Sequence, residues 1–196
     1  MTRRRSLAIL CAVSALAFPA FAANAPTDPP AAGPAESPVV PGLMMPAREN
    51  ALVTILTNAA RQYTHLRTAS QKAEARLAMQ ISVSKFMRES QEAHGWVGLI
   101  RASHRTTEGD IWLSIAIAPE IVLSTLQDRF QDDGYQTLIR ASSPLQSTVA
   151  EEMPVGQAVI FDGTMLIFDV SDNDGLIERP QIVTRFQKID RADNKN

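Results

Sequence analysis

The chain has 196 residues, a formal net charge of −2 and a single cysteine. That cysteine, Cys11, lies near the N-terminus, so the rest of the chain cannot hold a disulfide framework, a thiolate zinc site or a cysteine nucleophile. The acidic balance argues against a general affinity for nucleic acid, because phosphate contacts depend mainly on Lys and Arg.

Residues 1–22 have the three parts of a secretory signal peptide. Arginines at positions 3–5 precede an apolar run at 7–18, and Ala20-Phe21-Ala22 has the small residues of a cleavage site. The apolar run is shorter than the roughly 20 residues of a bilayer crossing. We therefore expect cleavage after Ala22, a periplasmic or secreted protein, and no membrane span after cleavage. An uncleaved anchor and a lipoprotein acceptor at Cys11 are the alternatives, and Leu10 disfavours the second.

The mature N-terminus is predicted to be a flexible linker. Loss of residues 1–22 removes three of the 19 basic residues and none of the 21 acidic ones, so the charge changes from −2 to −5. Residues 23–46 then hold seven of the twelve prolines. Because proline fixes φ and lacks a backbone donor, this stretch is predicted to be extended and Pro-rich. It is either a tether or simply an unstructured mature N-terminus.

Residues 47–93 are predicted to be helical, as one helix or as two joined near Thr68–Ser70. They contain no proline or glycine and are rich in residues that lose little side-chain freedom in a helix. We expect this segment to pack on the C-terminal domain, and a coiled-coil dimer is the alternative. Apolar residues at helical spacing predict the packed face: Leu52, Leu56, Ala59, Tyr63 and Leu66, continued by Ala73, Leu77 and Ile81.

Residues 94–190 are predicted to form short strands, and residues 191–196 a disordered tail. The clearest signal is the alternation of Ile111, Leu113, Ile115 and Ile117 with their neighbours. Ser143 and Pro144 predict the N-cap and first residue of a short helix that ends near Met153. Gly163 predicts a bulge or bend within a strand. The remaining predicted elements are strands at 96–100, 122–126, 135–139, 158–170 and 182–189, with turns at 108–109 and 172–175.

This order of elements and two local motifs resemble secreted bacterial proteins with an OB-like β-barrel. Gly95-Trp96-Val97-Gly98-Leu99-Ile100 is similar to the opening strand of such domains, and the segment from Val155 to Gly163 is similar to their fourth strand. The resemblance implies an α+β fold, in which a long N-terminal helix or helical hairpin packs on a small OB-like β-barrel of five to six strands. It implies no catalytic residues.

The sequence contains no recognisable catalytic, cofactor or metal motif. The three histidines, His65, His94 and His104, lack metal-ligand spacing, and no Gly-x-Ser-x-Gly motif occurs. The acidic turn at 172–175 lacks the terminal carboxylates of a calcium loop. We therefore expect a protein that is not an enzyme, with no cofactor.

The predicted binding surface combines aromatic and basic residues of the barrel and its loops at 101–108 and 134–142. Trp112 is out of phase with the buried isoleucines, so it either faces outward as a binding platform or, as we prefer, packs beneath the N-terminal helix. The candidate binding residues are Arg101, His104, Arg105, Trp112, Tyr135 and Arg140.

The favoured function is an exported binding or assembly protein whose partner is another envelope protein. One alternative is a single-stranded nucleic-acid binder in an exported DNA-handling or conjugation system. The other is a hydrolase whose site is assembled from distant residues.

Overall fold

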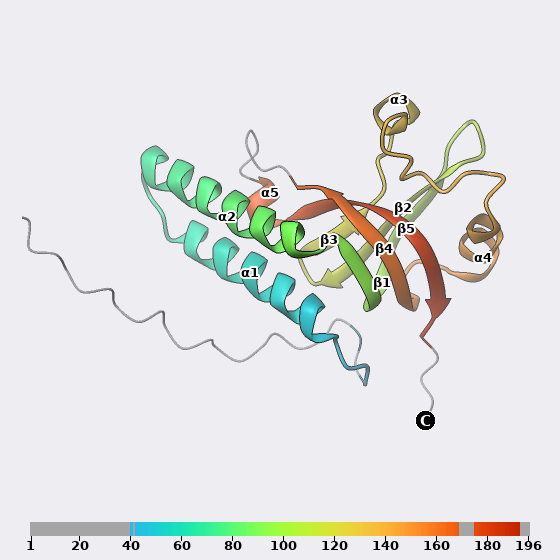
Figure 1. Cartoon of the computed structure of the whole chain (residues 1–196), viewed down its shortest axis with the longest axis horizontal. Coiled ribbons are helices and arrows are strands. Elements are labelled where there is room, and N and C mark those ends of the chain that lie inside the picture. The colour runs from blue at the N-terminus through green and yellow to red at the C-terminus, as the bar shows by residue number, and fades with distance from the viewer. Residues whose placement is uncertain (1–39, 41, 169–174, 193–196) are drawn as a thin grey trace, which may run out of the picture. The chain divides into compact units, whose positions relative to one another are not determined.

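The computed structural model describes residues 40, 42–168 and 175–192 (Figure 1). Within these residues, two long helices precede five strands that close into a barrel, so the α+β class is confirmed. The predicted signal peptide, most of the linker, the turn at 172–174 and the end of the tail lie outside the described residues. No helix in the described part combines the length and apolar character needed to cross a bilayer.

The barrel consists of β1 (Glu92–Arg105), β2 (Ile111–Ala118), β3 (Ile121–Ser124), β4 (Ala158–Ile167) and β5 (Gln181–Arg191). The strand order around the barrel is β1-β2-β3-β5-β4, with β4 pairing back to β1. Only the β3–β5 pairing is parallel among these strands. Three short helices, α3 (Arg129–Asp132), α4 (Pro144–Glu152) and α5 (Gly175–Glu178), lie in the connections after β3 and β4.

The helical segment is a hairpin of two helices, α1 (Ala47–Thr64) and α2 (Ala69–Glu89). Thr68 starts α2 through a capping box: its hydroxyl accepts the Gln71 N–H, and the Gln71 side chain accepts the Thr68 N–H. The helices run side by side, as Figure 1 shows, and the segment ends earlier than the predicted residue 93 because β1 already begins at Glu92.

The predicted apolar face is correct for α1 and wrong for α2. Leu52, Leu56 and Tyr63 are buried in the common core with the barrel. On α2, however, Leu77 and Ile81 are exposed, and the buried residues are Met79, Val83 and Phe86. The chain leaves the helical conformation between α1 and α2, so the helical spacing of apolar residues does not continue from one helix to the other. Apolar positions extrapolated from α1 therefore fall on the exposed side of α2.

Two strand predictions also need correction. β1 extends to Arg105, well past the predicted residue 100, and it starts before Gly95, whose φ of +62° accompanies a shift of register between Ala93 and Trp96. The predicted strand at 135–139 is reduced to one isolated bridge between Ile111 and Ile139.

Other local predictions are confirmed. A register shift between Asp162 and Gly163 forms the expected irregularity in β4. Ser143 caps α4, where its hydroxyl accepts the Leu145 N–H and Pro144 is the first helical residue. Gly98 allows the close approach of β1 and β2, since a Cβ there would lie 2.8 Å from the Ala116 carbonyl oxygen.

A buried carboxyl joins the hairpin to the barrel. Glu49, in the first turn of α1, is fully buried, and its Oε2 accepts the Val97 N–H of β1 at 3.0 Å. Its other oxygen has no partner among the described residues. Burial raises the pKa of Glu49 to about 8, although the Val97 hydrogen bond opposes this shift.

Candidate functional site

A stacked pair of rings lies on the outer face of the barrel. His104 of β1 and Trp112 of β2 are direct cross-strand partners, with ring centroids 5.3 Å apart and ring planes 11° from parallel. The strand alternation that buries Ile111 and Leu113 turns Trp112 outward. Trp112 Nε1 donates to the Thr125 carbonyl oxygen at 3.0 Å, which fixes the ring against the sheet.

The ring pair borders two adjoining cavities. The first, of about 1020 Å³, lies between the β1–β2 turn and the segment around α3. The second, of about 300 Å³, lies over β1, β2 and β3 near the start of β5. Trp112 and Gln127 line both cavities, and we call the two together the outer-face groove. The first cavity is lined by residues 104–108, Trp112, 127–130 and Asp133, and the second by Arg101, Ala102, Trp112, Ser114, Glu120, Val122, Gln127, Arg179 and Gln181.

Buried acidic residues hold the wall formed by α3. The Asp132 carboxylate is fully buried and accepts hydrogen bonds from the Thr137 N–H and hydroxyl and from the Leu138 N–H. Arg140 donates to Asp132 at 3.1 Å and to Asp110 at 2.9 Å, so one guanidinium connects the wall to the start of β2. These contacts fasten the irregular segment 129–141 to the barrel.

Asp110 is ionised in this network. Burial by itself raises the pKa of Asp110, but the Ala141 N–H and the Arg140 guanidinium, with Arg129 farther away, lower it below its ordinary value. The buried charge of Asp110 is therefore compensated, as such groups require in order to remain ionised inside a protein.

The groove carries charges of both signs. Arg105, Arg129, Glu108, Asp128 and Asp133 line the first cavity. Arg101, Arg179 and Glu120 line the second. A hydrogen bond from Thr107 lowers the pKa of Glu108, which keeps this exposed residue anionic. The lining of the groove therefore contains four arginines and four carboxylates, and no surplus of positive charge.

The structure brings together four of the six predicted binding residues. His104, Arg105 and Trp112 line the first cavity, and Arg101 lines the second. The preferred expectation that Trp112 packs beneath the helices is wrong, because its ring stacks on His104 in the groove.

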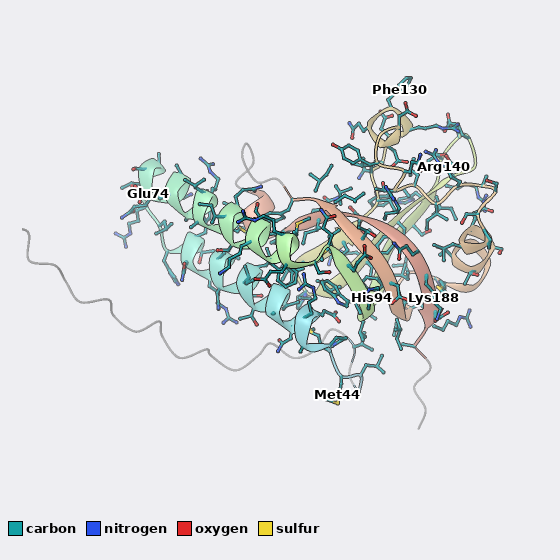
Figure 2. The ribbon with its side chains drawn as sticks, viewed as in Figure 1. Met44, Glu74, His94, Phe130, Arg140 and Lys188 are labelled. Carbon is teal, nitrogen blue, oxygen red and sulfur yellow. The ribbon has the colours of Figure 1, made fainter. Side chains whose placement is uncertain are left out.

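The other two predicted residues have different positions. Arg140 lies below Phe130 in the view of Figure 2. It supports the wall through ion pairs with Asp110 and Asp132. The Tyr135 side chain is exposed and lines neither cavity, while its carbonyl oxygen accepts hydrogen bonds from Arg185.

Sequence reasoning missed the segment that forms the second wall. Residues 127–130 and Asp133 line the first cavity, whereas the predicted loop was 134–142. Phe130, with 94% of its surface exposed, lies at the outer end of α3 in Figure 2. The one local signal is Asp128, whose carboxylate accepts the Phe130 N–H and caps α3.

The groove is lined by a stacked ring pair and by side chains that can donate or accept hydrogen bonds. In the described part of the chain, no group of three or more His, Cys, Asp or Glu residues has the arrangement of a metal site. The imidazole of His104 has a ring as its neighbour, and no hydrogen bond joins it to a described carboxylate or hydroxyl. No protein-family model, curated protein or solved structure matches this chain.

Proposed function

We propose that this chain is an exported, non-enzymatic binding or assembly protein that recognises another envelope protein through the outer-face groove. The observation that carries the proposal is the His104–Trp112 pair, a stacked and partly exposed aromatic platform whose tryptophan lines both cavities. Aromatic anchors in such positions contribute much of the binding energy at protein interfaces.

An OB-like identity of the barrel belongs to this proposal. It is supported by the strand order, by the parallel β3–β5 pairing and by the position of α4 between β3 and β4. OB barrels bind ligands on the face of their second and third strands and on the loop between the first two. The outer-face groove involves the corresponding elements here.

Export is supported by the sequence of residues 1–22 alone. The basic residues at its beginning, its short apolar run and the small residues at its end are typical of a cleaved signal peptide. N-terminal sequencing of the chain recovered from the cell envelope tests this part of the proposal. A mature N-terminus at Ala23 is expected, and an intact N-terminus in the cytosolic fraction would contradict it.

In-cell photo-crosslinking tests the groove as the binding surface. A benzoylphenylalanine at Thr107, on the groove wall, is expected to give a crosslinked species that Trp112→Ala abolishes. The control is the same crosslinker at Asn58, an exposed position on α1. Crosslinks that persist in the Trp112→Ala variant, equal crosslinking from position 58, or no crosslink at all would overturn the proposal.

A further inference from the structure

We infer that the ligand of the outer-face groove is an extended polypeptide segment that crosses β1, β2 and β3 and contacts both cavities. This inference rests on the proposed function, and it specifies the chemical class and the path of the ligand. Three properties of the groove carry it: its extent, its balance of charge and its aromatic platform.

The extent of the groove favours a linear ligand over a single small molecule. The first cavity begins at the β1–β2 turn, and the second reaches Gln181 at the start of β5. A ligand that runs from β1 across β2 and β3 to the start of β5 crosses three strand-to-strand steps of about 4.8 Å each. An extended peptide covers that distance with roughly five residues at about 3.3 Å per residue.

The charges of the groove favour a polypeptide over a phosphate polymer. Binding of a nucleic-acid backbone requires a surplus of Lys and Arg, because each phosphate contact is electrostatic. The four arginines of the groove are instead matched by four carboxylates, and Arg179 pairs with Glu120 at 3.2 Å. Polar side chains of both signs, together with backbone amides, complement a surface of this kind.

Two of these arginines form no ion pair with a carboxylate of the described residues. Arg101 donates to the Pro119 carbonyl oxygen at 3.1 Å, and Arg105 donates to the Gly109 carbonyl oxygen at 3.2 Å. One of them lies in each cavity. A guanidinium has five N–H donors, so each side chain retains donors for a carbonyl or carboxylate of a bound peptide.

The aromatic platform supplies the apolar contact. Trp112 has its N–H bonded to Thr125 and one ring face stacked on His104, so the rest of its half-buried ring is what remains for a ligand. Phe130 stands almost fully exposed at the rim of the first cavity. An aromatic or proline side chain of the peptide would stack between the sheet and this rim, in the manner of other peptide-binding grooves.

The test is a selection followed by direct binding measurements. A phage-displayed library of random 12-residue peptides is selected on the purified chain and depleted on its Trp112→Ala variant. Enriched peptides are then synthesised with a fluorescent label, and their affinities are measured by polarisation. Labelled dT20 and labelled chitohexaose are measured in parallel as a nucleic acid and an oligosaccharide.

We expect enriched peptides that share an aromatic or proline residue, and an affinity at least tenfold weaker for Trp112→Ala. Arg105→Ala and Arg101→Ala, one in each cavity, are expected to weaken binding about threefold to tenfold. Arg88→Ala, on the exposed side of α2, is the control and is expected to leave the affinity unchanged. Circular dichroism of each variant separates lost binding from lost folding.

Each other outcome overturns the inference in a distinguishable way. If Arg105→Ala weakens the affinity for the peptides and Arg101→Ala does not, the ligand does not cross both cavities. Binding of dT20 or chitohexaose that depends on Trp112, without peptide enrichment, would refute the polypeptide class but keep the groove as a binding site. If no probe binds in a Trp112-dependent way, the inference and the proposed function both fail.

Discussion

The helix side and the groove side of the barrel bury acidic groups in opposite ways. On the helix side, Glu49 has one backbone donor for two oxygens, and burial raises its pKa to about 8. On the groove side, Asp132 and Asp110 share the Arg140 guanidinium and accept several backbone N–H groups. The Glu49 carboxyl, which is neutral below about pH 8, holds α1 on β1 through one hydrogen bond. The groove wall is held instead by the ion pairs of Arg140 with Asp110 and Asp132.

The largest loss of stability is expected from a substitution in the network of Asp132, Arg140 and Asp110. Asp132→Ala removes the acceptor of three hydrogen bonds and leaves Arg140 with one carboxylate instead of two. We expect a loss of about 3 kcal/mol in the free energy of unfolding. Urea denaturation followed by tryptophan fluorescence measures it. Asp133→Ala, at the exposed neighbouring position, should change the stability by less than about 0.5 kcal/mol, and equal losses would refute the structural role of Asp132.

The raised pKa of the buried Glu49 predicts that the stability of the fold depends on pH. The pKa of Glu49 is about 8 in the folded chain, against an ordinary value of 4.5. Its contribution to the free energy of unfolding is therefore complete below pH 4.5 and is lost as the pH rises to 8. At about 1.4 kcal/mol per pH unit, the loss reaches at most about 5 kcal/mol. Urea midpoints measured between pH 4.5 and 8.5 record this dependence.

Glu49→Gln is expected to abolish most of that slope and to be more stable than the wild type at pH 8.5. Glu89→Gln, at an exposed position on α2, is the matched control and should retain the slope. A wild-type protein with the same slope as Glu49→Gln would contradict a raised pKa at Glu49.

The connection between the two sides depends on β1, which contributes to both. Gly98→Ala would place a Cβ 2.5 Å from a methyl of Ile115 and 2.8 Å from the Ala116 carbonyl oxygen, so β1 and β2 would have to separate. We expect about 2 kcal/mol of destabilisation, as for other overpacked sites. Gly134→Ala, where open space surrounds the added methyl, is the control. A thermal midpoint for Gly98→Ala as high as that of the control would refute this close approach.

The smallest effect on stability is expected at the N-terminus of α4. Ser143→Ala removes the hydroxyl that accepts the Leu145 N–H, and the loss of an N-cap costs about 1 kcal/mol. Ser142→Ala, one residue earlier and exposed, should have no measurable effect. Thermal unfolding of the two variants checks the difference, and a reversed order would mean that Ser143 is not the cap.

Local patterns predicted those parts of the fold that local physics determines. Period-two alternation identified β2 and turned Trp112 outward, and the Ser143-Pro144 pair identified the start of α4. The phase of α2 could not be predicted in the same way. The break at 65–68 disconnects it from α1, and the exposed Leu77 and Ile81 look apolar in sequence although they are not packed.

The groove was only half predictable for a related reason. His104 and Arg105 lie in the segment 101–108 that was predicted as a binding loop, although the structure places them at the end of β1. The wall at 127–133 is instead positioned by contacts between distant parts of the chain. The Arg140–Asp110 pair joins residues 30 positions apart. Nothing in the spacing of these residues indicates that pairing, which explains why Arg140 looked like a ligand-binding residue.

The two tryptophans of the chain offer the most direct test of the groove. Trp96 is buried in the core, where its ring contacts Phe161, and Trp112 lies in the groove. Each gives one indole N–H signal in a ¹H–¹⁵N spectrum, and the spectrum of Trp112→Phe assigns them. On addition of a selected peptide, we expect the Trp112 signal to shift while the Trp96 signal stays in place. A shift of Trp96 alone, or of neither signal at saturating peptide, would contradict this expectation.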